Sequence, residues 1–192
     1  MILNKLKVTG ALLSGHFELS SGLHSDQYIQ CAKFCMHSDL NYMAAGRLVD
    51  KLDEAAGKFT EVDSVISPAI GALLIGYETA RWLDVAFKFT EKSEGLMHLR
   101  RGFTIEPGER VLIVEDVTTT GMSAVKVASL VEIAGGKVQA VLSIVNRVAP
   151  KVEAFNSYRH HFLVEFKPKT YIPSRCPMCA DGISLDHPGS TK

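Results

Sequence analysis

The sequence predicts an α/β fold with a central, mostly parallel sheet flanked by helices. Apolar segments of strand length alternate along the chain with segments of helical periodicity, which is the pattern of βαβ units. The segment Val111 to Val114 is apolar at every position, as is typical of a strand buried on both faces of a parallel sheet. Because crossovers between parallel strands are right-handed, helices should pack against this sheet.

The expected elements follow the chain in order. Ser38 is a good cap for a helix because it precedes a run of apolar residues at helical spacing. Gly135 and Gly136 provide a stop for the helix that follows the central strand. We expect a short amino-terminal helix, irregular or hairpin structure over 15–32, helices over 39–56, 72–83 and 123–134, strands over 62–67, 85–89 and 138–146, a loop and hairpin over 90–107, an edge strand near 164–166, and an irregular tail over 168–192.

Length and charge limit the class of protein. The chain has 192 residues, which suits one domain with a sizeable core. Its 21 basic and 21 acidic residues balance, so no broad basic surface for nucleic acid is predicted. Apolar runs are shorter than a membrane span and the first residues do not resemble a secretory signal. We therefore expect a cytoplasmic protein that binds neither nucleic acid nor membrane.

Two carboxylates and a hydroxyl-rich loop follow the central strand. Glu115 and Asp116 come directly after Val114, and the loop from Thr118 to Ser123 opens the next helix. Ligands of open α/β sheets bind at this carboxyl edge, and free N–H groups at a helix start favour phosphate. The loop matches neither the nucleoside-triphosphate loop nor the dinucleotide fingerprint. Two carboxylates can accept hydrogen bonds from a vicinal diol, and the adjacent loop can bind a phosphate, so together they indicate a site for ribose 5-phosphate. The alternative is that Glu115 and Asp116 are solvated charges at a strand end and that the loop is an ordinary turn.

This loop resembles the fingerprint of the type I phosphoribosyltransferases, and other blocks narrow the family. The segment 15–28 resembles the amino-terminal hood signature of orotate phosphoribosyltransferases, and 89–103 resembles their mobile loop. The segment 144–147 resembles the strand that ends in their base-site arginine. The resemblance implies the type I phosphoribosyltransferase fold as a single domain over 1–192, with a small hood subdomain (about 1–35 plus the carboxyl-terminal tail) and a core (about 36–166).

The resemblance also implies an activity: transfer of the 5-phosphoribosyl group from 5-phosphoribosyl 1-diphosphate (PRPP) to orotate in de novo pyrimidine (UMP) biosynthesis. The products are orotidine 5'-monophosphate and pyrophosphate, so the protein would be a glycosyltransferase of the pentosyltransferase class. Mg²⁺ is the implied cofactor, with no protein side chain assigned as its ligand. A homodimer with shared active sites is implied, because the mobile loop reaches the neighbouring subunit's site.

Residue roles carried over from the family are expectations of the same kind. Lys92 and Asp116 are the catalytic candidates, and Thr119 and Arg147 would line the orotate site, although Arg147 could instead be a solvated strand-end charge. PRPP would contact Glu115, Asp116, Val117, Thr118, Thr119, Thr120, Gly121, Met122 and Ser123.

The pyrophosphate would meet two further segments. By resemblance, 67–72 is the pyrophosphate loop, but Ile70 and Gly71 stand where many relatives carry an aromatic residue and a lysine. Backbone N–H groups, Mg²⁺ and the mobile loop would then hold the anion; the alternative is a plain strand-to-helix turn. Preorganised cations stabilise a leaving group that gains charge. The candidate cations are Lys88, Lys92, His98, Arg100 and Arg101, of which the two arginines could instead be surface charges on a hairpin.

Four cysteines raise the question of a metal. Cys31 and Cys35, with Cys176 and Cys179, would be enough ligands for one tetrahedral zinc ion. Reduced thiols are the ordinary alternative in a cytoplasmic chain. His24 could be a hood contact or a surface histidine.

Two other functions are compatible with this fold. A purine or uracil phosphoribosyltransferase is the nearer one, but the chain has no purine hood. A nucleic-acid-binding regulator with this fold would need a basic surface or a helix-turn-helix segment, and the sequence provides neither.

Overall fold

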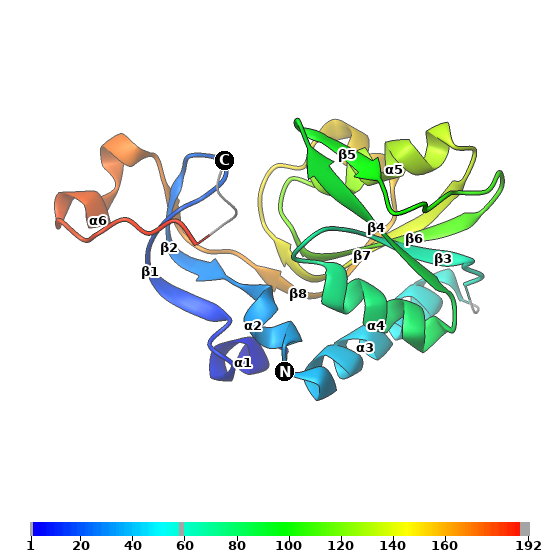
Figure 1. The fold of residues 1–192 in the computed structure, drawn as a ribbon. Coiled ribbons are helices and arrows are strands. Elements are labelled where there is room, and N and C mark those ends of the chain that lie inside the picture. The colour runs from blue at the N-terminus through cyan, green and yellow to red at the C-terminus, as the bar shows by residue number, and fades with distance from the viewer. Residues whose placement is uncertain (1, 58–59, 189–192) are drawn as a thin grey trace. The chain divides into compact units, whose positions relative to one another are not determined.

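The computed structural model describes residues 2–57 and 60–188, which fall into two compact units (Figure 1). The smaller unit combines Met1–Phe34 with Phe166–Lys192, and the larger unit is Cys35–Glu165. The hood and core ranges expected from the sequence differ from these by one residue at each boundary. The last four positions of the expected tail, 189–192, lie outside the described residues.

The larger unit is built around a six-stranded sheet. Strand β6 (Arg110–Thr118) pairs in parallel with β3 (Ser64–Pro68) and with β7 (Lys137–Arg147). Strand β3 also pairs in parallel with β4 (Ala86–Ser93). The hairpin partner β5 (Leu96–Leu99) pairs with β4 in the antiparallel direction. The predicted mostly parallel sheet is therefore confirmed. In spatial order, the strands are β5 (Leu96–Leu99), β4 (Ala86–Ser93), β3 (Ser64–Pro68), β6 (Arg110–Thr118), β7 (Lys137–Arg147) and β8 (His160–Phe166).

Helices flank this sheet (Figure 1). The helices α3 (Ser38–Ala56) and α4 (Leu73–Leu83) pack against each other, and α5 (Met122–Ile133) packs with Ile113 of β6 in an apolar core. The cap expected at Ser38 is wrong by one residue. His37 caps α3 and Ser38 is its first residue, so the Ser38 hydroxyl is not in the capping position. Within residues 2–57 and 60–188, no helix combines the length and apolarity needed to cross a bilayer.

The smaller unit is built on an antiparallel hairpin. Strands β1 (Leu12–Glu18) and β2 (His24–Ile29) pair with each other, and the short β9 (Thr170–Tyr171) pairs with β2. The sequence predicted an irregular tail, and this prediction is wrong for Thr170 and Tyr171, because their backbone joins this sheet. Around this sheet, the described part of the smaller unit has the helices α1 (Ile2–Val8), α2 (Cys31–Cys35) and α6 (Pro177–Ala180) and the 3-10 helix η2 (Pro173–Arg175). The 3-10 helix η1 (Glu153–Ser157) belongs to the larger unit.

The four cysteines, which the sequence left open as zinc ligands or as reduced thiols, do not form one group. Cys31 and Cys35 are buried in α2. Among the described residues, Cys176 and Cys179 instead lie beside His16 and His24. His24 is also not a surface histidine, since its side chain is buried.

Candidate active site

The two carboxylates lie on the last part of β6. Residues 111–114 are fully buried, and the strand continues through Glu115 and Asp116 to Thr118. Glu115 is buried and Asp116 is half-buried. Burial, together with the neighbouring Asp116 charge, raises the pKa of Glu115 well above its ordinary value. Burial also raises the pKa of Asp116, against the opposing effect of backbone N–H donors. The pair therefore favours a ligand that brings hydroxyl donors or positive charge.

The loop after β6 turns directly into α5. Gly121 caps the helix with φ +81°, a left-handed conformation that suits glycine. The Oγ1 of Thr118 is buried and makes no hydrogen bond within the described residues. The backbone N–H of Met122 donates to Oγ1 of Thr120 over 3.4 Å. First-turn N–H groups of a 12-residue helix and nearby hydroxyls thus form an anion-binding arrangement.

Lys151 holds this loop against the end of β7, and sequence reasoning did not identify it. Its Nζ donates to the carbonyl of Thr119 and, over 2.8 Å, to Oδ1 of Asn146. Burial, followed by the nearby charge of Arg147, lowers the pKa of Lys151. No motif marks this lysine, because its partners are backbone carbonyls and one amide oxygen that only the fold brings together.

The expected pyrophosphate loop lies alongside Asp116. A Cβ added to Gly71 would stand 2.8 Å from Oδ2 of Asp116, so only glycine leaves room for the carboxylate there. The Oγ of Ser67 is buried and has no partner within the described part of the chain. Ile70 is 84% exposed. Helix α4 begins at Leu73, so this loop is also followed by a helix start.

The expected cations do not form one group. Lys88 forms an ion pair with Glu109, next to the start of β6. Burial raises the pKa of Glu109, but hydrogen bonds from Lys88 and Ser64 outweigh it and the net shift is downward. The charge of Lys88 is therefore paired within the sheet, and its role as a cation for pyrophosphate stays a prediction.

The rest of the expected mobile loop is largely a hairpin. Strand β4 places Lys92 opposite Met97 of β5, and Lys92 is exposed. Arg101 donates to Glu91 over 2.8 Å and lowers the pKa of that carboxyl, which matches the alternative of a surface charge on a hairpin. His98 lies opposite Glu91, and Arg100 is exposed. Lys92 and Arg100 thus remain exposed charges of this segment.

The two expected orotate contacts are neighbours at the end of the sheet. Thr118 of β6 is in register with Asn146 of β7. Thr119 directly follows β6 and Arg147 is the last residue of β7, so the two residues come next at the same edge of the sheet. This edge also carries Glu115 and Asp116, as expected for a ligand site of an open α/β sheet.

The carboxylate pair, the two loops and the parallel sheet define the phosphoribosyltransferase class. A scan against models of known families found no match. The crystal structure of orotate phosphoribosyltransferase from Aeropyrum pernix superimposes with a TM-score of 0.73 and 26% identity, covering 86% of this chain and 94% of that one. An adenine phosphoribosyltransferase from Thermoanaerobacter pseudethanolicus, at 20% identity and a TM-score of 0.63, shares the fold over 73% of this chain and 88% of that one.

Sequence relatives specify the family. Orotate phosphoribosyltransferase from Carboxydothermus hydrogenoformans is 46% identical over 182 residues, which cover 95% of this chain and 93% of the relative. Orotate phosphoribosyltransferase from Chlorobium phaeobacteroides strain BS1 is 44% identical over 98% of this chain and 94% of the relative. The chain belongs to the orotate phosphoribosyltransferase family.

Proposed function

We propose that this chain transfers the phosphoribosyl group of PRPP to orotate, giving orotidine 5'-monophosphate and pyrophosphate. The observation that carries the proposal is the position of Asp116 between two loops that each precede a helix. The loop after β6 offers N–H and hydroxyl groups to a 5'-phosphate, and the loop at Gly71 reaches the same carboxylate. A ribose between the two loops would place its hydroxyls on Asp116 and Glu115, with phosphoryl groups at both ends.

In the proposed reaction, N1 of the orotate anion attacks the anomeric carbon while the bond to pyrophosphate breaks, with inversion. Orotate N1 can react as an anion, so no protein nucleophile is required. The protein supplies positioning and charge stabilisation. The exposed charge of Lys92 suits the leaving pyrophosphate.

Mg²⁺ belongs to this proposal. It prefers oxygen ligands and commonly binds through one or two carboxylates, water and substrate phosphates. Glu115 and Asp116 would offer carboxylate oxygens to the ion, and its charge would oppose the burial that raises the pKa of both acids. When bound with PRPP, Mg²⁺ would neutralise charge on the diphosphate.

Orotate carries a carboxylate, which a guanidinium binds well. Arg147 and Thr119 follow paired strands at the edge that holds Asp116, and this proximity supports their assignment to the base site. We place the enzyme in the cytoplasm, with its small-molecule substrates.

The decisive experiment is an assay of the purified protein with orotate, PRPP and Mg²⁺, followed by the loss of orotate absorbance. Adenine, hypoxanthine and uracil are tested in parallel under the same conditions. Turnover of orotate alone is the expected result. Turnover of another base, with orotate unchanged, would refute the assignment of the substrate.

Replacing Gly71 with alanine should lower kcat/KM for PRPP by about 10- to 100-fold, because small displacements in a site are costly. The added Cβ meets only the Asp116 carboxylate at short range, so the protein should fold normally. Steady-state kinetics with PRPP varied, together with a thermal melt, provide the measurement. An unchanged kcat/KM would show that the carboxylate can move without consequence.

Replacing Lys92 with alanine should lower kcat by about 10- to 100-fold and change orotate binding much less, since its charge would act on the developing pyrophosphate. Lys137→Ala is the matched control, because Lys137 is also an exposed lysine of a strand. Initial rates over a grid of both substrates separate the two effects. A raised KM for orotate with kcat unchanged would make Lys92 a base-site residue.

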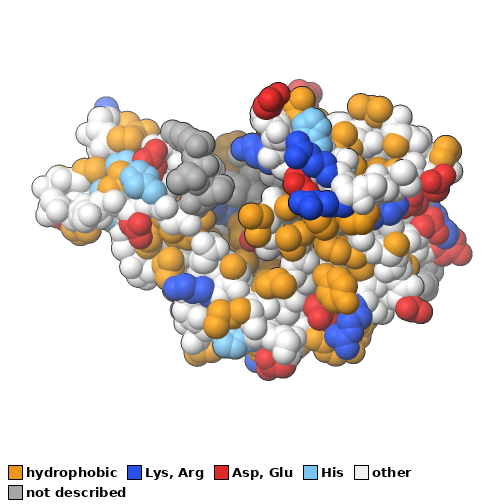
Figure 2. All heavy atoms as spheres, viewed as in Figure 1, with side chains coloured by type: hydrophobic (Ala, Val, Ile, Leu, Met, Phe, Trp, Pro, Cys, Tyr) orange, Lys and Arg blue, Asp and Glu red, His pale blue; other side chains and the backbone are white. Residues whose placement is uncertain are grey.

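We also propose a homodimer. Helices α3 and α4 expose large apolar side chains, and Figure 2 shows hydrophobic side chains gathered over this face. Tyr42 is 41% exposed and Tyr77 is 55% exposed, and such a patch on a soluble protein marks an interaction surface. The members of the patch are Tyr42, Ile70, Leu74, Tyr77 and Trp82.

Sedimentation of the wild type and of Tyr77→Glu tests the dimer, with a dimer and a monomer expected respectively. Mixing Asp116→Asn with Lys92→Ala tests shared sites. If Lys92 acts in the partner's site, a mixed dimer has one site with both residues intact and activity returns. A monomeric wild type would end this proposal.

A further inference from the structure

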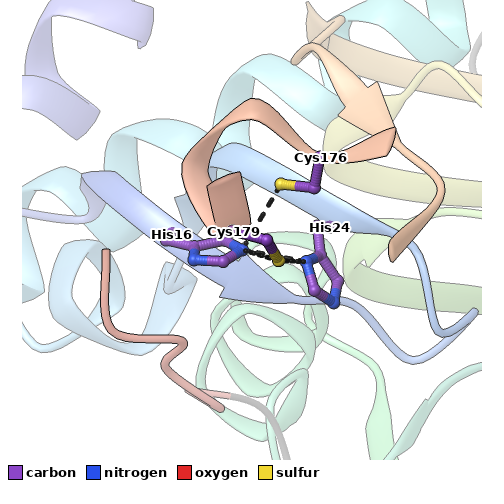
Figure 3. A group of neighbouring side chains, drawn as sticks. All are labelled: His16, His24, Cys176 and Cys179. Carbon is purple, nitrogen blue, oxygen red and sulfur yellow. Dashed lines mark hydrogen bonds between the residues drawn. The ribbon is translucent and has the colours of Figure 1, made fainter. Parts of the chain in front are cut away.

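Four side chains of the smaller unit converge on one point (Figure 3). They are His16, His24, Cys176 and Cys179, and their potential ligand atoms all lie within 4.8 Å of one another. The two histidines come from the paired strands β1 and β2. Cys176 directly precedes α6, and Cys179 is the third residue of that helix. Two sequence segments about 150 residues apart are thus joined at a single cluster.

The three nitrogen–sulfur distances of the cluster fit a tetrahedral zinc ion. Zn–S bonds of about 2.3 Å and Zn–N bonds of about 2.05 Å place a nitrogen and a sulfur ligand about 3.5 Å apart. Sγ of Cys176 lies 3.5 Å from Nε2 of His16, and Sγ of Cys179 lies 3.6 Å from the same nitrogen. Sγ of Cys179 lies 3.3 Å from Nδ1 of His24.

Hydrogen bonds alone do not account for the cluster. Nε2 of His16 has three close neighbours, namely both sulfurs and, at 2.8 Å, Nδ1 of His24. A ring nitrogen has one in-plane position, which holds either a proton or a lone pair. It therefore cannot pair properly with three partners, whereas a cation between them would satisfy all four atoms together.

A second-layer contact prepares His16 as a ligand. Its other ring nitrogen, Nδ1, lies 2.8 Å from the carbonyl oxygen of Ile183. A carbonyl only accepts hydrogen bonds, so Nδ1 must carry the proton and Nε2 presents its lone pair to the cluster. Histidine ligands of metals typically make such a bond through the nitrogen that faces away from the ion.

The backbone around the cysteines forms a compact knuckle. The N–H of Ala180 donates to the carbonyl of Cys176, and the N–H of Gly182 donates to that of Cys179. Gly182 has φ +69°, which lets the chain turn back sharply. The C-x-x-C spacing is the one used by zinc knuckles.

The smaller unit gains from such a crosslink. With roughly 60 residues, it is in the size range where a structural metal commonly supplements a small core. The tail is already seated on the hairpin, because the N–H of Asp186 donates to the carbonyl of His16 and the N–H of Glu18 donates to that of Asp186.

We propose that His16, His24, Cys176 and Cys179 bind one structural zinc ion that fastens the carboxyl-terminal segment to the hairpin. Four protein ligands complete the tetrahedron, which leaves no position for substrate. The site is separate from the reaction proposed above, so it stands or falls independently of the enzymatic activity.

The test uses untagged protein purified without a metal resin, reduced, incubated with Zn²⁺ and passed through a desalting column. Elemental analysis should find about one zinc per chain in the wild type and below about a tenth in Cys176→Ser and Cys179→Ser. Cys179 is exposed, so its serine variant should fold. Cys31→Ala is the matched control and should retain the zinc.

Two further readouts need no variant. Cobalt in place of zinc should give the intense visible bands of a tetrahedral ion with thiolate ligands, and removal of zinc by a chelator should lower the melting temperature of the wild type. Zinc below about a tenth of an equivalent in the wild type after incubation would overturn the proposal. Equal zinc in the wild type and Cys179→Ser would also overturn it, because the metal would then lie elsewhere.

Discussion

Asp116→Asn should lower kcat/KM for PRPP by about 10- to 100-fold, the loss expected when a hydrogen bond to a charged acceptor is removed. The carboxylate would accept hydrogen bonds from the ribose hydroxyls, and an amide also presents donors that meet those hydroxyls poorly. Kinetics with PRPP varied at saturating orotate measure the effect. Unchanged kcat/KM would remove Asp116 from the diol site.

The same substitution should not weaken the free protein. Burial raises the pKa of Glu115 and of Asp116, so folding becomes less favourable as the pH rises from the unfolded values towards the folded ones. At neutral pH the buried pair of acids therefore costs stability, and replacing Asp116 with a neutral side chain should raise the melting temperature or leave it unchanged. Lower activity at equal or higher stability separates a functional role from misfolding.

Asp84→Asn is the matched control for Asp116→Asn. Asp84 is exposed at the end of α4, where it adopts a left-handed conformation with φ 55° that asparagine tolerates. The Asp84→Asn substitution removes the same charge at a position outside the candidate site. Full activity in this variant assigns the loss in Asp116→Asn to the position of the charge.

The sequence predicted the parts of the site that depend on local pattern. Residues 111–114 are continuously apolar, and a strand of that kind is buried in a parallel sheet with its carboxyl end at the ligand edge. The acids and the helix start follow within the same segment, so their proximity needs no long-range information. The same holds for the loop at Gly71, which follows the neighbouring strand β3.

The missed features depend on contacts between distant segments. Lys151 donates mainly to backbone carbonyls, which every residue has, so no spacing in the sequence marks its partners. In the sequence, Lys88 cannot be distinguished from the other cations of its segment, and only the folded sheet places Glu109 beside it. The cluster at His16 mixes residue types from both ends of the chain, and counting cysteines alone pointed to Cys31 and Cys35 as the missing ligands.

Gly121→Ala should cost about 2–5 kcal/mol in the free energy of unfolding, because two penalties add. Gly121 has φ +81°, a left-handed conformation that is unfavourable for alanine. A Cβ there would also stand 2.4 Å from two ring atoms of Phe155, a residue that is buried in η1. The loop that would bind the 5'-phosphate must then shift, so KM for PRPP should rise as well.

Gly108→Ala separates the two penalties in Gly121→Ala. Gly108 has φ +84°, and a Cβ there would meet nothing within 4 Å, so its alanine variant carries the backbone penalty alone. Urea unfolding of both variants gives the comparison. A further loss of about 1–3 kcal/mol in Gly121→Ala measures the contact with Phe155. Equal losses in the two variants would mean that Phe155 moves aside freely and that the loop does not depend on this packing.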